Sequence, residues 1–175
     1  MTRTLRICVL RHGETEENIA RILQGHLPGK LTENGRQAAL AAAKDLPLHT
    51  FDAVVSSDLQ RVVDTVHLLF GGEPPVPWEQ NLAFREINWG SMTGRYIPET
   101  DMKHLAPDVE TREQLYERAG KALGYLRENY AGKTILLVSH GLFLRSFIAH
   151  AEGVSMQMLR KIPHLKNCEH RWLEV

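Results

Sequence analysis

The decisive stretch is Thr134-Ile135-Leu136-Leu137-Val138-Ser139-His140-Gly141, the most apolar run of the chain followed at once by small and polar residues. A short, continuous apolar run that stops at polar residues is typical of a strand buried on both faces. Residues 142–151 then form a largely apolar segment that is long enough for a buried helix. The stretch therefore predicts a strand, a turn that carries His140, and a helix.

The same order of segments recurs along the chain. Residues 5–10 and 51–55 are short apolar runs that also stop at polar residues. Two further strands are expected, one near Asn81-Leu82 and one at residues 171–175. Strands that alternate with helices predict an α/β fold, a three-layer sandwich whose mostly parallel central sheet carries helices on both faces.

Capping residues indicate where three of the helices begin. Thr32 is the expected N-cap of a helix over residues 32–44. Thr111 with Gln114 predicts a capping box for a helix that Gly132 ends, and Ser57 with Gln60 resembles a second capping box.

Length and composition set the class of protein. The 175 residues fit a single domain, 1–175, within which the least periodic stretch, 88–111, is expected to be a covering loop. The formal net charge is zero, so no nucleic acid and no anionic membrane is favoured as a partner. The two cysteines lie outside any Cys-X-X-Cys spacing, and the N-terminus has neither a signal peptide nor a spanning segment, so we expect a cytoplasmic protein.

Polar side chains follow the predicted strands. They lie in four segments, Arg11–Glu14, Ser56–Arg61, Arg85-Glu86 and Ser139–Gly141. Because ligands of an open α/β sheet bind at the carboxyl ends of its strands, we expect these segments to meet at one rim. Two histidines, two arginines and one carboxylate would then share a pocket.

This set of side chains suits a dianionic phosphoryl group. Arginine binds phosphate oxygens in a bidentate manner, and helix N-termini near Ser57 and Gly141 add N–H donors. A neutral imidazole can attack phosphorus in line, and a nearby glutamate can protonate the departing oxygen. Each residue alone has a simpler interpretation, such as an ion pair of Glu86 with Arg85 or Arg95, and only the joint pattern indicates phosphoryl transfer.

The chain also resembles a known family, the histidine phosphatase superfamily, which includes the cofactor-dependent phosphoglycerate mutases. The resemblance rests on Leu10-Arg11-His12-Gly13-Glu14-Thr15 with Asn18, on residues 21–25, 31–38 and 56–61, on Arg85-Glu86-Ile87 with Trp89-Gly90 and Gly94, and on Val138-Ser139-His140-Gly141 with Arg145. These motifs occur in the order of the family and span most of the chain.

The resemblance implies both a fold and a set of roles. It implies a six-stranded, mainly parallel sheet and catalysis without a metal or other cofactor. His12 would become a phosphohistidine, and Glu86 would be the proton donor and acceptor. The phosphoryl oxygens would be bound by Arg11, Arg61, His140 and Asn18. The substrate end of the pocket would be lined by Gln24 and Gly25.

The sequence departs from the family pattern at several positions. Glu17, Lys30 and Leu142 replace an aromatic residue, a proline and a second glycine that are usual there. The stretch between Glu86 and His140 is short and lacks the paired arginines with which mutases hold a carboxylated substrate. A shorter cover should admit water, so we expect hydrolysis of a small phosphorylated metabolite.

Other functions stay open at this point. They are phosphoglycerate mutase-type transfer, a phosphatase of phosphohistidine or other phosphoproteins, a metal-dependent hydrolase with His12 and His140 as ligands, and a module that only binds phosphorylated partners. The histidine spacing suggests no metal site. The sequence does not indicate the substrate or the oligomeric state, although pairing of the last strand at a sheet edge would give a homodimer.

Overall fold

The structure is a computed structural model that describes residues 4–175. Five strands form one sheet in this part of the chain, in the order β3-β2-β4-β1-β5. Their bounds are β1 (Arg6–Arg11), β2 (Ala53–Ser56), β3 (Trp78–Gln80), β4 (Thr134–Ser139) and β5 (His170–Glu174). The first four run parallel, and β5 pairs antiparallel with β1 at one edge. The predicted mostly parallel sheet is confirmed.

The expected six strands are wrong for residues 4–175, where the sheet has five. The strand expected near Asn81-Leu82 is β3, which ends earlier, at Gln80. Asn81 accepts a hydrogen bond from the N–H of Ala83 through its side chain, and a 3₁₀ turn follows at Leu82–Phe84. Asparagine turns the chain in this way because its short amide competes with the sheet for backbone groups.

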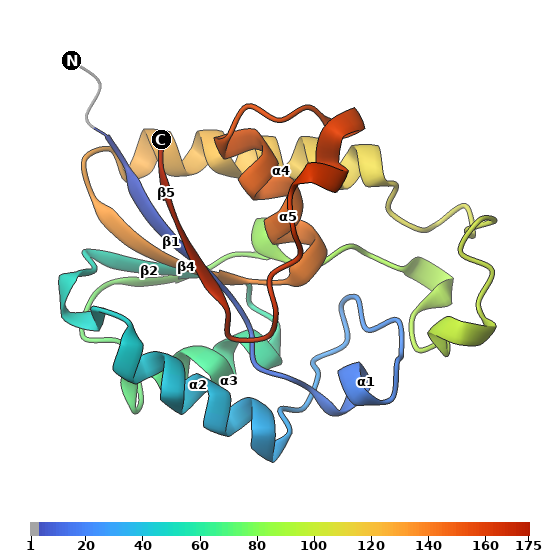
Figure 1. Cartoon of the computed structure of the whole chain (residues 1–175), viewed down its shortest axis with the longest axis horizontal. Coiled ribbons are helices and arrows are strands. Elements are labelled where there is room, and N and C mark those ends of the chain that lie inside the picture. Colours follow the sequence, from blue (N-terminus) through green and yellow to red (C-terminus); the bar gives the residue numbers. More distant parts are fainter. Residues whose placement is uncertain (1–3) are drawn as a thin grey trace.

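Helices cover both faces of the sheet, as Figure 1 shows. They are α1 (Glu16–Ile19), α2 (Glu33–Asp45), α3 (Gln60–Phe70), α4 (Arg112–Asn129) and α5 (Gly141–Ala151), with 3₁₀ turns at Leu48–Thr50, Leu82–Phe84, Gly90–Met92, Ile97–Glu99 and Met156–Lys161. α2 and α3 lie on one face, and α4 and α5 on the other. The predicted three-layer sandwich is therefore confirmed.

The two faces of the sheet divide the core. Ile135 and Leu137 of β4 pack among the side chains of α4 and α5, whereas Leu136 and Val138 pack with those of α2 and α3. Successive side chains of a strand point to opposite faces, so a central strand of this sandwich must be apolar throughout. This requirement accounts for the continuous apolar run of residues 135–138.

Two of the three predicted helix caps are present. The Thr32 hydroxyl accepts a hydrogen bond from the N–H of Gly35 at 2.9 Å, at the start of α2. Thr111 and Gln114 form the expected capping box at the start of α4. The predicted capping box of Ser57 and Gln60 is wrong, since α3 begins at Gln60 after Leu59 without a side-chain cap.

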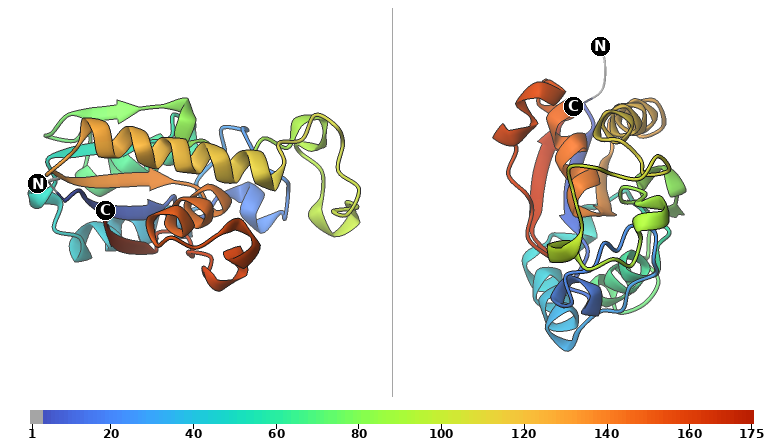
Figure 2. Two further views of the ribbon diagram at one scale, coloured as in Figure 1. Left: turned by 90° about the horizontal axis from the view of Figure 1, so that it is seen from above. Right: turned by 90° about the vertical axis from the view of Figure 1, so that its right-hand side faces the viewer.

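Residues 88–111, which we call the covering segment, extend beyond the carboxyl ends of the parallel strands (Figure 2). Backbone hydrogen bonds join this segment to residues 21–23, from Leu23 N to Arg95 O and from Ile97 N to Arg21 O. Within residues 4–175, no helix has the length and apolar character needed to cross a membrane.

Candidate active site

The register of the sheet brings three chain segments together at the carboxyl ends of its strands. Arg11 is paired with Ser139, and Ser56 with Val138. The next residues along the chain are His12, His140 and Ser57, so all three leave the sheet at nearly the same level. The convergence expected from the sequence is thus a consequence of parallel strands in this register.

The imidazole of His12 is held in one orientation. Its Nδ1 lies 2.7 Å from the carbonyl oxygen of Gly13. A carbonyl oxygen can only accept, so Nδ1 carries the hydrogen and Nε2 keeps its lone pair. Burial, Arg61 and Arg11 hold the pKa of His12 well below its ordinary value. The ring is therefore neutral near pH 7, which is the state in which Nε2 is a nucleophile.

Arg61 lies beside this nitrogen. Its Nε is 3.3 Å from Nε2 of His12, and the rest of the guanidinium donates to the carbonyl oxygens of Leu27 (2.5 Å) and Gly25 (2.8 Å). Burial lowers the pKa of Arg61 to about 10, so the group stays charged at neutral pH. Gly29 permits this packing, because a Cβ there would lie 2.8 Å from Cδ of Arg61.

Arg11 supplies a second cation to the site. Its Nη1 donates to the carbonyl oxygen of Leu165 at 2.9 Å. Among residues 4–175, two buried side-chain polar atoms have no hydrogen-bond partner, namely Nε of Arg11 and Nδ1 of His140. Buried polar groups are almost always paired, so two unpaired donors or acceptors at one site are typical of a binding site for a polar ligand.

Glu86 lies at the N-terminus of α5. One carboxylate oxygen accepts hydrogen bonds from the N–H groups of Ile87 and Phe143, both at 3.0 Å, and the other from Leu142 at 3.1 Å. The simpler interpretation, an ion pair with Arg85 or Arg95, does not apply, since Arg85 pairs with Asp58 and no ion pair within residues 4–175 involves Glu86. Two N–H groups at the start of α5, those of Leu142 and Phe143, therefore bind the Glu86 carboxylate. The expectation that this helix start donates directly to a phosphoryl group is wrong for these two N–H groups.

His140 is fully buried and precedes α5. Its Nε2 lies 2.8 Å from the hydroxyl of Ser57, and its ring centroid is 5.2 Å from that of His12. Burial and Arg61 hold the pKa of His140 well below its ordinary value. Ser57 was expected as a cap, but its hydroxyl instead orients this histidine, a role for which the sequence carries no signal.

The loop after β1 is held by its own polar side chains. Gln24 and the hydroxyl of Thr15 are hydrogen-bonded at 2.9 Å, and Asn18 accepts from the N–H of Thr15. Asn167, which the sequence did not single out, donates to the carbonyl oxygen of His12 at 3.0 Å. This contact joins the segment before β5 to the site across more than 150 residues.

Seven of the nine predicted site residues line one cavity of about 160 Å³: Arg11, His12, Asn18, Gln24, Gly25, Arg61 and Glu86. His140 and Gly141 lie outside its lining, and a Cβ at Gly141 would be 3.3 Å from Cζ of Arg11. The other lining residues are apolar, namely Ile22, Leu23, Trp89, Ile97 and Leu142. The cavity lining thus combines two arginines, a histidine, a carboxylate and two amides with five apolar side chains.

A larger cavity of about 720 Å³ lies nearby, and His26, Asn88 and Arg118 are among its lining residues. It contains none of the predicted site residues, so its size alone does not make it the reaction site. Among residues 4–175, no group of three or more His, Cys, Asp and Glu side chains is arranged as a metal site.

Comparison with known proteins identifies the family. Residues 7–175 match the family described as the histidine phosphatase superfamily, branch 1. The chain is 31% identical over 165 residues to phosphoglycerate mutase-like protein 4 of Arabidopsis thaliana, with 83% of this chain and 70% of that protein covered. It is 25% identical over 150 residues to a Bacillus subtilis protein named uncharacterized phosphatase PhoE, with 84% and 77% covered.

A solved structure agrees with this match. Bacillus stearothermophilus YhfR superposes on the chain with a TM-score of 0.87 at 26% identity, over 98% of this chain and 91% of that one. The expected family is therefore confirmed, and the chain belongs to the histidine phosphatase superfamily, branch 1.

Proposed function

We propose that this protein is a phosphatase that hydrolyses phosphomonoesters through a phosphohistidine formed on Nε2 of His12. The observation that carries the proposal is the position of this nitrogen. It belongs to a neutral imidazole that lines the cavity, and it lies 3.3 Å from the guanidinium of Arg61. A neutral nucleophile beside a fixed positive charge is suited to attack on a dianionic phosphoryl group.

The reaction would take place in two steps. Nε2 of His12 forms a bond to phosphorus while the bond to the ester oxygen breaks, and the carboxyl group of Glu86 gives that oxygen a proton. Glu86 then takes a proton from water as the water oxygen attacks phosphorus and the P–N bond breaks. Arg11 and Arg61 stabilise the charge on the equatorial oxygens, since both line the same cavity.

The lining of the cavity favours hydrolysis over mutase-type transfer. Within residues 4–175, Arg11 and Arg61 are the arginine and lysine residues of the lining, which also contains five apolar side chains. A mutase must hold a carboxylated intermediate during the reaction, for which further cations are needed. We therefore propose a small phosphorylated metabolite as the substrate and no metal requirement.

A panel of phosphomonoesters assayed for release of inorganic phosphate tests the proposal. Phosphate release is expected to continue in excess chelator and to be lost in His12→Ala. His49→Ala is the control and should retain activity, because His49 is exposed and does not line the cavity. An acid-labile, alkali-stable phosphoenzyme should form in the parent and be absent in His12→Ala. Near-normal turnover by His12→Ala would refute the phosphohistidine.

Two further substrates test the alternatives. Isomerisation of a phosphoglycerate without phosphate release would establish a mutase instead. Dephosphorylation of phosphohistidine peptides at much higher kcat/KM than of any metabolite would establish a phosphoprotein phosphatase.

A further inference from the structure

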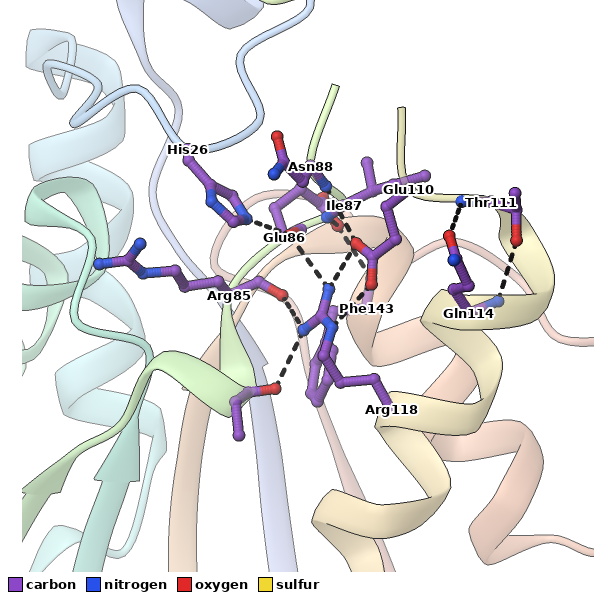
Figure 3. Close-up of polar contacts among 11 residues, drawn as sticks. His26, Arg85, Glu86, Ile87, Asn88, Glu110, Thr111, Gln114, Arg118 and Phe143 are labelled. Carbon is purple, nitrogen blue, oxygen red and sulfur yellow. Dashed lines mark hydrogen bonds and ion pairs between the residues drawn. The ribbon is translucent and has the colours of Figure 1, made fainter. Parts of the chain in front are cut away.

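Arg118 of α4 binds the main chain on both sides of Glu86 (Figure 3). Its Nη1 donates to the carbonyl oxygens of Ala83 (3.0 Å) and Arg85 (2.8 Å), and its Nη2 donates to that of Glu86 (3.2 Å). Residues 83–86 lie between β3 and the covering segment, beyond the end of the sheet ladder. Arg118 therefore supplies the donors that this part of the chain does not receive from a neighbouring strand.

The charge of Arg118 is balanced by Glu110. Nε and Nη2 of Arg118 donate to the two carboxylate oxygens of Glu110, both at 2.8 Å, and the side chains are only 25% and 14% exposed. With the three carbonyl oxygens, these two bonds engage all five N–H groups that a guanidinium has. A lysine has three donors on one nitrogen and cannot replace this arrangement.

Glu110 also connects the network to the covering segment. Its carboxylate accepts a hydrogen bond from the N–H of Asn88 at 3.0 Å, and its own N–H donates to the carbonyl oxygen of Asn88 at 2.8 Å. Arg118 and Glu110 thus hold both the start of the covering segment, next to Glu86, and its end, next to α4.

Arg118 also contacts Phe143, a residue at the start of α5 that binds the Glu86 carboxylate. Cζ of Arg118 lies 5.3 Å above the ring of Phe143, and the N–H of Phe143 donates to that carboxylate. From the opposite side, Nε2 of His26 donates to the carbonyl oxygen of Glu86 at 2.9 Å. Arg118 thus contacts both the main chain of Glu86 and the first turn of α5.

We propose that Arg118 is a positioning residue for proton transfer by Glu86. It fixes the main chain of Glu86 against α5, so that the carboxyl group reaches from the helix N-terminus into the cavity that His12 lines. This inference rests on the proposed function, in which Glu86 protonates the leaving oxygen. Glu86 also serves as the base in the second step, which all substrates share, so the test uses kcat/KM, which reports formation of the phosphohistidine. Displacement of Glu86 should lower kcat/KM only for those substrates whose leaving group needs a proton.

Two aromatic substrates separate this role from a general role in folding. Benzyl phosphate releases an alkoxide and depends on the proton, whereas 4-nitrophenyl phosphate releases a stable phenolate and needs it little. In Arg118→Met, which keeps the apolar stem, we expect kcat/KM for benzyl phosphate to fall about 100-fold, a typical contribution of general acid catalysis. For 4-nitrophenyl phosphate the change should stay within about threefold.

Three comparisons make the test specific. Glu86→Gln should show the same selective loss, and adding Arg118→Met to it should cause little further loss, because both changes remove one function. Arg118→Lys should show the same selective loss of kcat/KM for benzyl phosphate, since the single nitrogen of lysine cannot hold three carbonyl oxygens and a carboxylate. Arg171→Met, on the edge strand β5, breaks an ion pair with Glu152 whose side chains are 36% and 31% exposed, and it should leave the ratio of the two substrates unchanged.

The outcomes distinguish this inference from the proposed function. A selective loss in Glu86→Gln with a parallel loss of both substrates in Arg118→Met would overturn the inference alone. If Arg118→Lys kept the parent ratio of kcat/KM for the two substrates, the inference would also be overturned, because a positive charge without the five donors of a guanidinium would then suffice. An unchanged ratio in Glu86→Gln would overturn the role of Glu86 and this inference together.

Discussion

Nε of Arg61 lies 3.3 Å from Nε2 of His12, while the two other nitrogens of the same guanidinium hold the carbonyl oxygens of Gly25 and Leu27. One side chain thus faces the proposed nucleophile and also shapes the loop that forms the wall of the cavity. Because Arg61 is 1% exposed, these contacts are made in a region from which water is largely excluded. Electrostatic stabilisation of a phosphoryl group is strongest under such conditions.

Arg61→Lys is expected to reduce kcat/KM by about 10²-fold, because a single ammonium cannot face His12 and hold both carbonyl oxygens. Steady-state phosphate release measures the effect. Arg36→Lys, at an exposed position of α2, is the matched control and should leave kcat/KM unchanged. A loss of less than threefold in Arg61→Lys would contradict the role of the guanidinium.

Ser57→Ala is expected to lower kcat about tenfold, since His140 would lose the hydroxyl that orients its Nε2. The free energy of unfolding should also fall by about 1–3 kcal/mol, because a buried ring nitrogen would lose its partner. Turnover and urea unfolding measure the two effects. Ser155→Ala removes an exposed hydroxyl that makes no cap hydrogen bond, and both quantities should stay at their parent values there.

Gly141→Ala is expected to impair catalysis more than folding. The added Cβ would lie 3.3 Å from both Cζ and Nε of Arg11, so the guanidinium must shift by a few tenths of an ångström. We expect kcat/KM to fall about tenfold from this misplacement.

Gly124→Ala is the matched control for that substitution, because a Cβ there meets nothing within 4 Å. It lies in α4 and should stabilise the protein by about 0.5–1 kcal/mol with no loss of activity. Equal activities of the two alanine variants would refute the close approach of Arg11 to Gly141.

The free energy of unfolding should fall as the pH is lowered through about 6.5. His12 and His140 are buried with pKa values well below normal, so the folded state leaves them neutral while the unfolded state takes up protons. Stability from this source is present above the unfolded pKa and is lost below it, by up to about 1.4 kcal/mol per pH unit for each histidine.

Urea unfolding between pH 7.5 and 5.5 measures this dependence. His140→Gln should give a shallower acid limb than the parent, whereas His49→Gln, at an exposed histidine, should keep the parent slope. Parallel curves for the parent and His140→Gln would show that His140 takes up its proton equally in both states.

Local sequence patterns were sufficient for the layers of the fold. The apolar run 135–138 identified β4, and Thr32 and Thr111 marked where α2 and α4 begin. Burial on both faces and capping by a nearby side chain are constraints within a few residues, so they are visible in a sequence. Because the predicted strands are parallel, the residues that follow them were expected to meet, and Arg11, His12, Arg61 and Glu86 line one cavity. Asn18, Gln24 and Gly25 also line it, but they were expected from the family resemblance alone.

The contacts that hold the site together depend on the assembled fold. The donors of Arg118 bind Ala83, Arg85 and Glu86 through main-chain oxygens. Every residue has such an oxygen, so no side-chain pattern marks these partners. The bond between Ser57 and His140 likewise joins positions 83 residues apart, and it exists only because β2 and β4 are paired in this register. The place of His12 in the cavity could thus be predicted from residue types and order, whereas the orientation of the groups around it follows from long-range packing.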